Sequence, residues 1–264
     1  MSVSSPVLRV RTLGTGAADH DWRHIGSPGV RGSAGTLADG RILIDCGVTG
    51  EENLTRFGIR PDALDLILIS HSHEDHFDPE KVARLIAAKP RIGLVGTPRV
   101  IERVRAFRPN LTAHPVTPGT CVAAAGVRVT ALAANHAIPD PADQALHYLI
   151  ETAGGTLLYL LDGAWMLTPT RRLLGRTRVD MVIWDATIGA TEGDHRIFEH
   201  CDLPMLAHMR RTLERDGVFH AGTVHIADHA ARTLWPEDEA AARALAERYG
   251  FRLAGDGDEF TFGR

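Results

Sequence analysis

The residues best suited to chemistry stand in one short run, His71 to His76, which reads His-Ser-His-Glu-Asp-His. Imidazole nitrogens and a carboxylate are the donors that Zn²⁺ and similar metals bind in proteins. A run of surface histidines is the alternative interpretation. We favour a metal site because an apolar stretch precedes the run and a helix start follows it, so rigid elements would hold the donors.

Three more polar residues follow apolar stretches farther along the chain. They are His136, Asp162 and His225. One histidine after a strand is more often a structural residue. Three such placements beside the dense motif favour a single site built from strand ends. Asp45 also ends an apolar stretch, and its carboxylate either orients a metal-bound histidine or caps the next turn.

These residues, in this order, resemble the metallo-β-lactamase superfamily of binuclear hydrolases. The resemblance runs from Leu13-Gly14-Thr15-Gly16-Ala17 to the final strands. It implies one metal held by His71, His73 and His136. It implies a second metal held by Asp75, His76 and His225, with Asp162 bridging the two. The superfamily pattern favours the first histidine after the strand, so His225 is preferred over His229, which would then contact the substrate or orient a ligand.

The implied cofactor is a pair of divalent metal ions. Zn²⁺ suits these donors best, and Mn²⁺ or Fe²⁺ also fits. Two metals about 3.5–4 Å apart lower the pKa of bound water to roughly 7 and neutralise charge on the reacting oxygens. Asp75, as a ligand of the second metal, is counted with the catalytic residues.

Within the superfamily, the chain resembles most the branch of phosphoribosyl cyclic-phosphate phosphodiesterases and, more distantly, the tRNA 3′-processing endonucleases. The supporting segments are Leu13–Ala17, Asp185-Ala186-Thr187 and His195–His200. In that branch a histidine after the Asp-Ala-Thr-like strand end is the general acid. The resemblance makes His200 that acid, and His195 is the fallback. An imidazole suits the role because its pKa lies near working pH.

Two departures from the branch bear on the substrate. Residues 18–31 contain no cysteine, so we expect no separate structural zinc. No basic insertion suited to tRNA is visible, so a small phosphodiester is the preferred substrate. Arg31 lies in a long loop predicted over residues 19–35 that should border the site. It is a candidate phosphate contact, although a surface arginine is an equal alternative.

The expected function is therefore a binuclear phosphodiesterase that cleaves a small or cyclic phosphodiester with metal-bound hydroxide. One alternative is a lactone, carboxyl-ester or β-lactam hydrolase with the same metals, which would tolerate the loss of His200. Another is a non-hydrolytic accessory protein that keeps the metal and binds a partner.

Apolar strands and proline-marked helix starts should position these residues. The predicted helices are Pro79–Ala88, Pro98–Phe107, one starting at Thr168-Pro169, Leu203–Arg215 and Pro236–Tyr249. The predicted strands are Val7–Leu13, Arg41–Asp45, Leu64–Ser70, Cys121–Ala125, Val127–Ala134, Leu146–Thr152, Thr156–Leu161, Val179–Trp184, Val218–Val224 and two short ones within Phe251–Phe262. We expect an α+β fold in which two mixed β-sheets flanked by helices form a four-layer αββα sandwich. Residues 1–264 should form one domain.

Composition excludes several other classes of protein. A formal net charge of −4 argues against binding long nucleic acid. No signal peptide and no membrane-length apolar stretch are visible, so no membrane partner is expected. Three widely separated cysteines, Cys46, Cys121 and Cys201, fit a cytoplasmic protein. A homodimer is the usual expectation for such enzymes.

Overall fold

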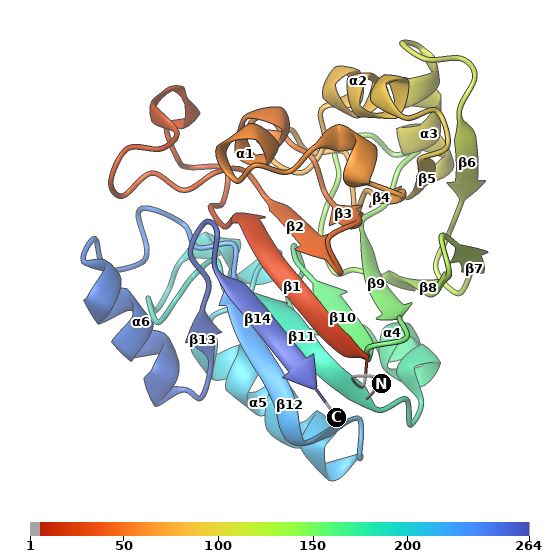
Figure 1. Cartoon of the computed structure of the whole chain (residues 1–264). Helices are drawn as coiled ribbons and strands as arrows, with labels where there is room; N and C mark the ends of the chain where they lie inside the picture. Colours follow the sequence, from red (N-terminus) through yellow and green to blue (C-terminus); the bar gives the residue numbers. More distant parts are fainter. Residues whose placement is uncertain (1–5, 264) are drawn as a thin grey trace, which may run out of the picture.

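Two β-sheets of seven strands each pack face to face, with helices on both outer faces (Figure 1). This computed structural model describes residues 6–263. The strand order is β14-β1-β2-β3-β4-β5-β6 in one sheet and β13-β12-β11-β10-β9-β8-β7 in the other. Both sheets mix parallel and antiparallel pairs, so the predicted αββα sandwich of the α+β class is confirmed.

The first sheet contains mostly N-terminal strands. They are β1 (Val7–Gly14), β2 (Gly35–Ala38), β3 (Ile42–Ile44), β4 (Leu66–Leu68), β5 (Gly93–Gly96), β6 (Thr112–Pro115) and β14 (Glu259–Gly263). Its outer face is covered by α1 (Gly50–Arg56), α2 (Pro79–Ala88) and α3 (Pro98–Arg105). A short 3₁₀ turn, η2 (Pro61–Ala63), precedes β4, and another, η1 (Trp22–His24), lies in the long N-terminal loop.

The second sheet contains the later strands. They are β7 (Cys121–Ala124), β8 (Val127–Ala133), β9 (Leu146–Glu151), β10 (Thr156–Leu160), β11 (Val179–Asp185), β12 (Phe219–Asp228) and β13 (Arg252–Leu253). The helices that pack on its outer face are α4 (Thr168–Leu174), α5 (Leu203–Arg215) and α6 (Glu239–Arg248). A 3₁₀ turn, η3 (His195–Phe198), leads into α5. No helix in residues 6–263 is long and apolar enough to cross a membrane.

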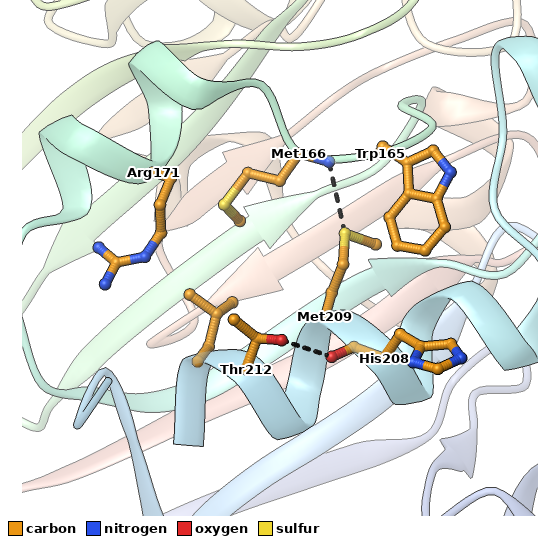
Figure 2. Close-up of a pocket in the computed structure, with 7 residues that line it drawn as sticks. Trp165, Met166, Arg171, His208, Met209 and Thr212 are labelled. Atoms are coloured by element: carbon orange, nitrogen blue, oxygen red, sulfur yellow. Dashed lines mark hydrogen bonds between the residues drawn. The ribbon is translucent and has the colours of Figure 1, made fainter. Parts of the chain in front are cut away.

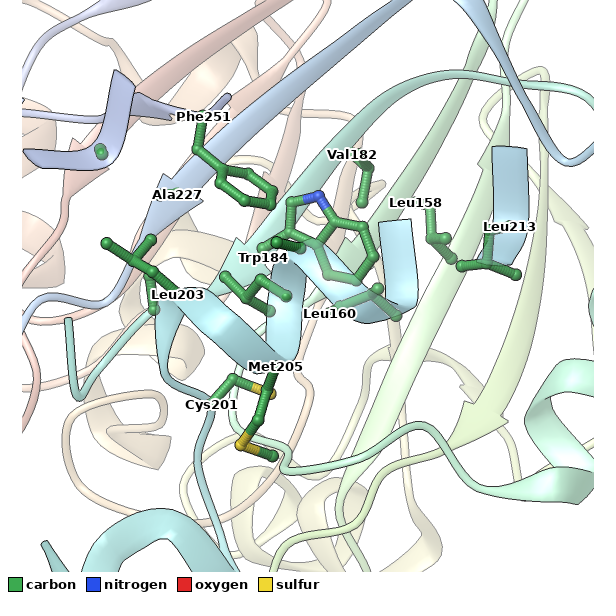
Figure 3. Packing of buried hydrophobic residues seen from close by; sticks show 14 of the residues in the cluster. Leu158, Leu160, Val182, Trp184, Cys201, Leu203, Met205, Leu213, Ala227 and Phe251 are labelled. Carbon is green, nitrogen blue, oxygen red and sulfur yellow. The ribbon is translucent and has the colours of Figure 1, made fainter. Parts of the chain in front are cut away.

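Alternating side chains of each strand fill two different cores, as the pleat of a β-strand requires. In β11, Met181 and Ile183 point between the sheets, whereas Val182 and Trp184 point towards the helices. Figure 3 shows Trp184 packed beside Phe251 and the α5 residue Leu203. Burying an apolar side chain of this size stabilises the fold by about 1.5–3 kcal/mol. The two cores therefore fix the strand ends on which the polar residues sit.

The helix starts follow their capping chemistry. Asp78 accepts hydrogen bonds from the backbone of Glu80 and Lys81, so α2 starts at Pro79 as predicted. The last helix starts at Glu239, because Asp238 caps it by accepting from the Ala241 backbone N–H. The prediction of a start at Pro236 was wrong, since Trp235 has no capping group.

Strand β12 is longer than predicted. Its parallel pairing with β11 continues from Met181↔Val224 to Asp185↔Asp228, four residues beyond the expected end. The sequence analysis also missed α1, β2, β5 and β6, which are short or glycine-rich. The extension of β12 changes which histidine first follows the strand.

Gly47 provides a test of how tightly the His71–His76 segment is held. A Cβ at Gly47 would lie 2.2 Å from the backbone oxygen of Asp75, which no side chain can tolerate. We expect Gly47→Ala to lower the free energy of unfolding by about 1–3 kcal/mol, because the backbone must move to relieve the overlap. Urea unfolding measures the change.

The matched control is Gly35→Ala. Gly35 is also buried, but a Cβ there would make only ordinary contacts at 3.7 Å. Equal stability of the wild type and Gly47→Ala would show that the loop is not held by this contact.

Candidate metal centre

Strand ends from both sheets meet around one cavity of about 450 Å³. The His71–His76 segment follows β4, Asp162 follows β10 and His229 follows β12. His136 comes from the loop after β8. The loop predicted over residues 19–35 borders the cavity only through its first residue, Asp19, and Ala17 and Ala18 before it also line the cavity.

The first group of donors is His71, His73, His136 and Asp162. His73 Nδ1 lies 3.1 Å from His71 Nε2 and 3.1 Å from His136 Nε2. Asp162 Oδ2 lies 3.3 Å from His136 Nε2 and 3.5 Å from His71 Nε2. The four donor atoms therefore surround one point.

The second group is Asp75, His76, His229 and, again, Asp162. The Nε2 atoms of His76 and His229 are 3.1 Å apart, and His229 Nε2 is 3.3 Å from Asp75 Oδ2. Asp162 Oδ1 lies 3.1 Å from His76 Nε2 and 3.2 Å from His229 Nε2. Asp162 thus gives one oxygen to each group.

These separations fit metal coordination. A tetrahedral ion with ligands at about 2.0–2.1 Å separates neighbouring ligand atoms by about 3.3–3.4 Å. The separations here run from 3.1 to 3.7 Å. The buried Oδ1 of Asp162 accepts no hydrogen bond within residues 6–263, and an orphaned carboxylate oxygen in a buried site calls for a cation. The donor set therefore fits divalent metal ions.

The second ring nitrogen of most of these histidines is anchored. Asp45 is fully buried and its Oδ2 accepts from His76 Nδ1 at 2.8 Å. His229 Nδ1 lies 2.8 Å from the Thr187 hydroxyl, and His136 Nδ1 lies 3.2 Å from the backbone oxygen of Glu199. Such partners fix the tautomer and direction of a metal-binding ring. Asp45 was predicted either to orient a metal-binding histidine or to cap the next turn, and its contact with His76 favours the first of these.

Backbone strain is concentrated at the same place. Asp45, Asp162 and His229 have φ values of 63°, 53° and 63°. A positive φ is unfavourable for residues other than glycine and persists where the surroundings impose it. The other such residues in the described chain, Asp39 and Ala125, each precede a glycine in a hairpin turn. The site therefore holds the strained residues that no turn explains.

His225 is a correction to the sequence analysis, which made it a metal ligand. It lies inside β12 and points to the helix-covered face, where its ring meets Trp184, Phe219 and Phe251. Its Nδ1 accepts a hydrogen bond from Trp184 Nε1 at 3.3 Å. Burial lowers the pKa of His225 to about 3, so the ring stays neutral. His229, predicted to contact the substrate, takes the place among the donors.

The end of β12 explains the difference. The first histidine after β12 is His229, because β12 ends at Asp228. The strand predicted from the sequence ends at Val224, which makes His225 the first histidine after it.

Arg31 is a second correction. Its guanidinium donates to Thr15 Oγ1 at 2.9 Å and to the backbone oxygen of Ala254, and it pairs with Glu239 at 2.8 Å. It lines a different cavity, beside Trp235, and not the one that contains the donors. The arginine that lines the donor cavity is Arg196, which was not predicted from the sequence.

His200 lines the donor cavity, where its ring centre is 5.0 Å from that of His136. Its Nδ1 lies 2.7 Å from Asp185 Oδ2. Burial alone would lower its pKa, but the carboxylate of Asp185 outweighs burial and raises the pKa of His200 to about 9. His195, the fallback acid, is on the exposed side of η3 and does not line the cavity.

Burial and neighbouring charges set the protonation of the donors. Burial lowers the pKa of His71 to about 4, which keeps its ring neutral. Burial alone would also lower the pKa of His76 and of His229, but the carboxylates of Asp162 and Asp75 raise it, so a metal would displace protons from these two rings. Although burial alone would raise it, the imidazoles of His229, His76 and His136 hold the pKa of Asp162 well below its usual range, so this carboxylate is in the ionised form that binds metals.

Another cavity, of about 230 Å³, lies between α4 and α5 (Figure 2). Its walls are mainly apolar, and Met209 Sδ accepts a hydrogen bond from the Met166 backbone N–H at 3.4 Å. The lining residues are Trp165, Met166, Arg171, His208, Met209, Thr212 and Leu213. None of the predicted ligands is among them.

Comparison with known proteins agrees with this geometry. A family model described as a beta-lactamase superfamily domain matches residues 40–233. No curated protein sequence matches the chain significantly.

Several solved structures share the fold. A diphosphatase from the PhnP family is 20% identical, with a TM-score of 0.70, and the match covers 97% of each chain. Zn²⁺-bound PqqB from Methylobacterium extorquens is 16% identical, with a TM-score of 0.71, over 96% of this chain and 99% of that one. Human tRNase Z, short form, is 19% identical, with a TM-score of 0.67, over 96% of this chain and 98% of that one. At these identities the likeness shows the fold alone.

Metal content distinguishes the two candidate histidines. We expect His229→Ala to retain about one metal equivalent fewer than the wild type after dialysis, because it removes a donor of the second group. His225→Gln, which keeps an acceptor for Trp184, should retain the wild-type amount. Elemental analysis of the purified proteins measures this, and metal loss in His225→Gln alone would contradict the assignment.

His225 should also make the protein sensitive to acid. Its pKa is about 3 when folded and about 6.5 when unfolded, so the unfolded chain takes up the proton first. Its contribution to stability is complete above pH 6.5 and is lost as the pH falls towards 3. Between pH 7 and pH 5 this group should cost the wild type about 2 kcal/mol.

Urea unfolding at the two pH values tests this expectation. The difference in unfolding free energy between pH 7 and pH 5 should be smaller in His225→Gln by about that amount. If the unfolding free energy changed equally between pH 7 and pH 5 in the wild type and in His225→Gln, folding would not lower the pKa of His225.

Proposed function

The chain belongs to the metallo-β-lactamase superfamily, and from that premise we propose that it is a binuclear phosphodiesterase acting on a small or cyclic phosphodiester. The observation that carries the proposal is the position of His200. It stands beside two donor groups that share Asp162, and Asp185 fixes its ring. A hydrolase of activated esters does not require such an acid, whereas an alkoxide leaving from a phosphodiester does.

Two divalent ions fit the donors, one held by His71, His73 and His136 and the other by Asp75, His76 and His229, with Asp162 between them. Zn²⁺ is the first choice for imidazole and carboxylate donors, and Mn²⁺ or Fe²⁺ is also suitable. When bound, such a pair activates water and neutralises charge on a phosphoryl group.

The protein's own residues orient the substrate and move the proton. Asp185 and Thr187 hold Nδ1 of His200, at 2.7 and 3.1 Å, which leaves Nε2 to donate to the leaving oxygen. The carboxylate of Asp185 raises the pKa of His200, so the ring carries its proton at neutral pH. The Thr187 hydroxyl also lies 2.8 Å from His229 Nδ1, so the acid and a ligand ring share one positioning residue.

The size of the site supports a small substrate. A volume of about 450 Å³ falls in the range of about 300–1,000 Å³ typical of small-molecule sites. Two of the similar structures, the diphosphatase and tRNase Z, carry the names of enzymes that act on phosphate linkages. This likeness favours a phosphoryl over a carbonyl electrophile.

A substrate screen tests the proposal. Metal-loaded protein should hydrolyse bis-p-nitrophenyl phosphate and small cyclic phosphates, and chelation should abolish the activity. Lactones and β-lactams serve as the comparison set. Protein that holds two metals and opens lactones but leaves every phosphodiester intact would overturn the proposal.

The effect of removing His200 on kcat should depend on the leaving group of the substrate. We expect His200→Ala to lower kcat about 10²–10⁴-fold for an alkyl phosphodiester, whose leaving oxygen needs a proton. The loss should be small for p-nitrophenolate, which leaves as a stable anion. Steady-state kinetics with both substrates measures this dependence.

His195→Ala is the matched control, because His195 is exposed on the same turn and should leave both rates near wild type. Equal losses for the two leaving groups in His200→Ala would remove His200 from the acid role.

A further inference from the structure

Two carboxylates at the donor cavity are not neutralised by other side chains. Glu74 lies in the loop after β4 of the first sheet. Glu199 lies in the turn after η3, in the connection that follows β11 of the second sheet. Both line the cavity. Both side chains are exposed to solvent.

Neither carboxylate accepts a hydrogen bond from a side chain within the described part of the chain. The nearest charged or titratable partner of Glu199 is His136, whose Nδ1 is 3.8 Å from Oε2. That imidazole is neutral when it serves as a metal ligand. For Glu74, no ion pair is formed with any of residues 6–263. Both negative charges therefore act on whatever enters the cavity.

Arg196 is the arginine that lines this cavity, and its charge is already offset. Its Nε lies 2.9 Å from Asp194 Oδ1, and its Nη1 lies 3.7 Å from Asp19 Oδ2. The protonated ring of His200 is likewise offset, by Asp185 at 2.7 Å. Five further carboxylates line the cavity: Asp19, Glu74, Asp75, Asp162 and Glu199. Two divalent ions would bring the cavity close to neutrality before any substrate enters.

We propose that Glu74 and Glu199 determine the charge of the substrate, by admitting a singly charged phosphodiester and disfavouring dianions such as phosphomonoesters. The inference rests on the proposed function insofar as it places a phosphoryl substrate in this cavity. It goes further by naming the residues that discriminate and the substrate class that they reject. Repulsion of the wrong ligand is a common source of specificity.

The expected size of the effect follows from Coulomb's law. At about 8 Å, an extra charge interacts with each carboxylate by about 0.5–2 kcal/mol for effective dielectric constants between those of water and a protein surface. We therefore expect each neutralising substitution to improve binding of a dianion, relative to a monoanion, by about two- to thirtyfold.

The experiment measures binding with two probes that contain no bond to hydrolyse. Diphenylphosphinate carries one negative charge, and phenylphosphonate carries two at pH 8.5. Calorimetric dissociation constants of both are measured for metal-loaded wild type, Glu74→Gln, Glu199→Gln and the double variant. Glu247→Gln, which removes an exposed carboxylate of α6 far from the cavity lining, is the matched control.

The expected result is that phenylphosphonate gains affinity relative to diphenylphosphinate in both single variants and gains most in the double variant. The gain should shrink at high salt, which screens exposed charges. Glu247→Gln should keep the wild-type ratio. An unchanged ratio in the double variant would overturn the inference, as would weaker binding of the monoanion, which would make these carboxylates substrate contacts.

The two proposals fail separately. If no phosphodiester is hydrolysed, the proposed function is wrong whatever the probe affinities show. If phosphodiesters are hydrolysed while the affinity ratio does not respond to Glu74 and Glu199, only this inference is wrong.

Discussion

The buried carboxylate of Asp162 is the constraint on which the rest of the structure depends. It is charged, almost inaccessible to water and has one oxygen without a hydrogen bond in the described chain. A buried anion of this kind is stable only beside cations. Imidazoles lie on both sides of this carboxylate, and hydrogen-bonding partners such as Asp45 and Thr187 orient their rings. The left-handed backbone at Asp162 and His229 is tolerated because two packed cores fix β10 and β12.

The sequence predicted most of the site because strong local signals mark it. The His71–His76 run lies between a buried strand and a capped helix, and Asp162 directly follows an apolar strand. The sequence did not predict His229 as a metal ligand, because the end of β12 depends on pairing with β11, which is a non-local interaction. The sequence also does not indicate whether Arg31 or Arg196 lines the donor cavity, because this too depends on non-local interactions. Which of the two reaches the cavity depends on tertiary ion pairs, of Arg31 with Glu239 and of Arg196 with Asp19.

Side chains of different chemical character line different parts of the cavity. The floor collects imidazoles and carboxylates, which are donors that suit divalent cations. One wall carries His200, whose proton is kept by Asp185. The mouth carries Glu74 and Glu199, which act on the charge of an incoming molecule. In the proposed function, metal binding, proton transfer and selectivity therefore belong to different side chains, so substitutions should separate them experimentally.

Anomalous X-ray diffraction from crystals grown with zinc tests the central claim most directly. The account predicts two anomalous peaks in the cavity, both within about 2.0–2.2 Å of an Asp162 oxygen. One peak should also contact His71, His73 and His136, and the other Asp75, His76 and His229. A single peak, or a second metal bound at His225 and not at His229, would contradict the account.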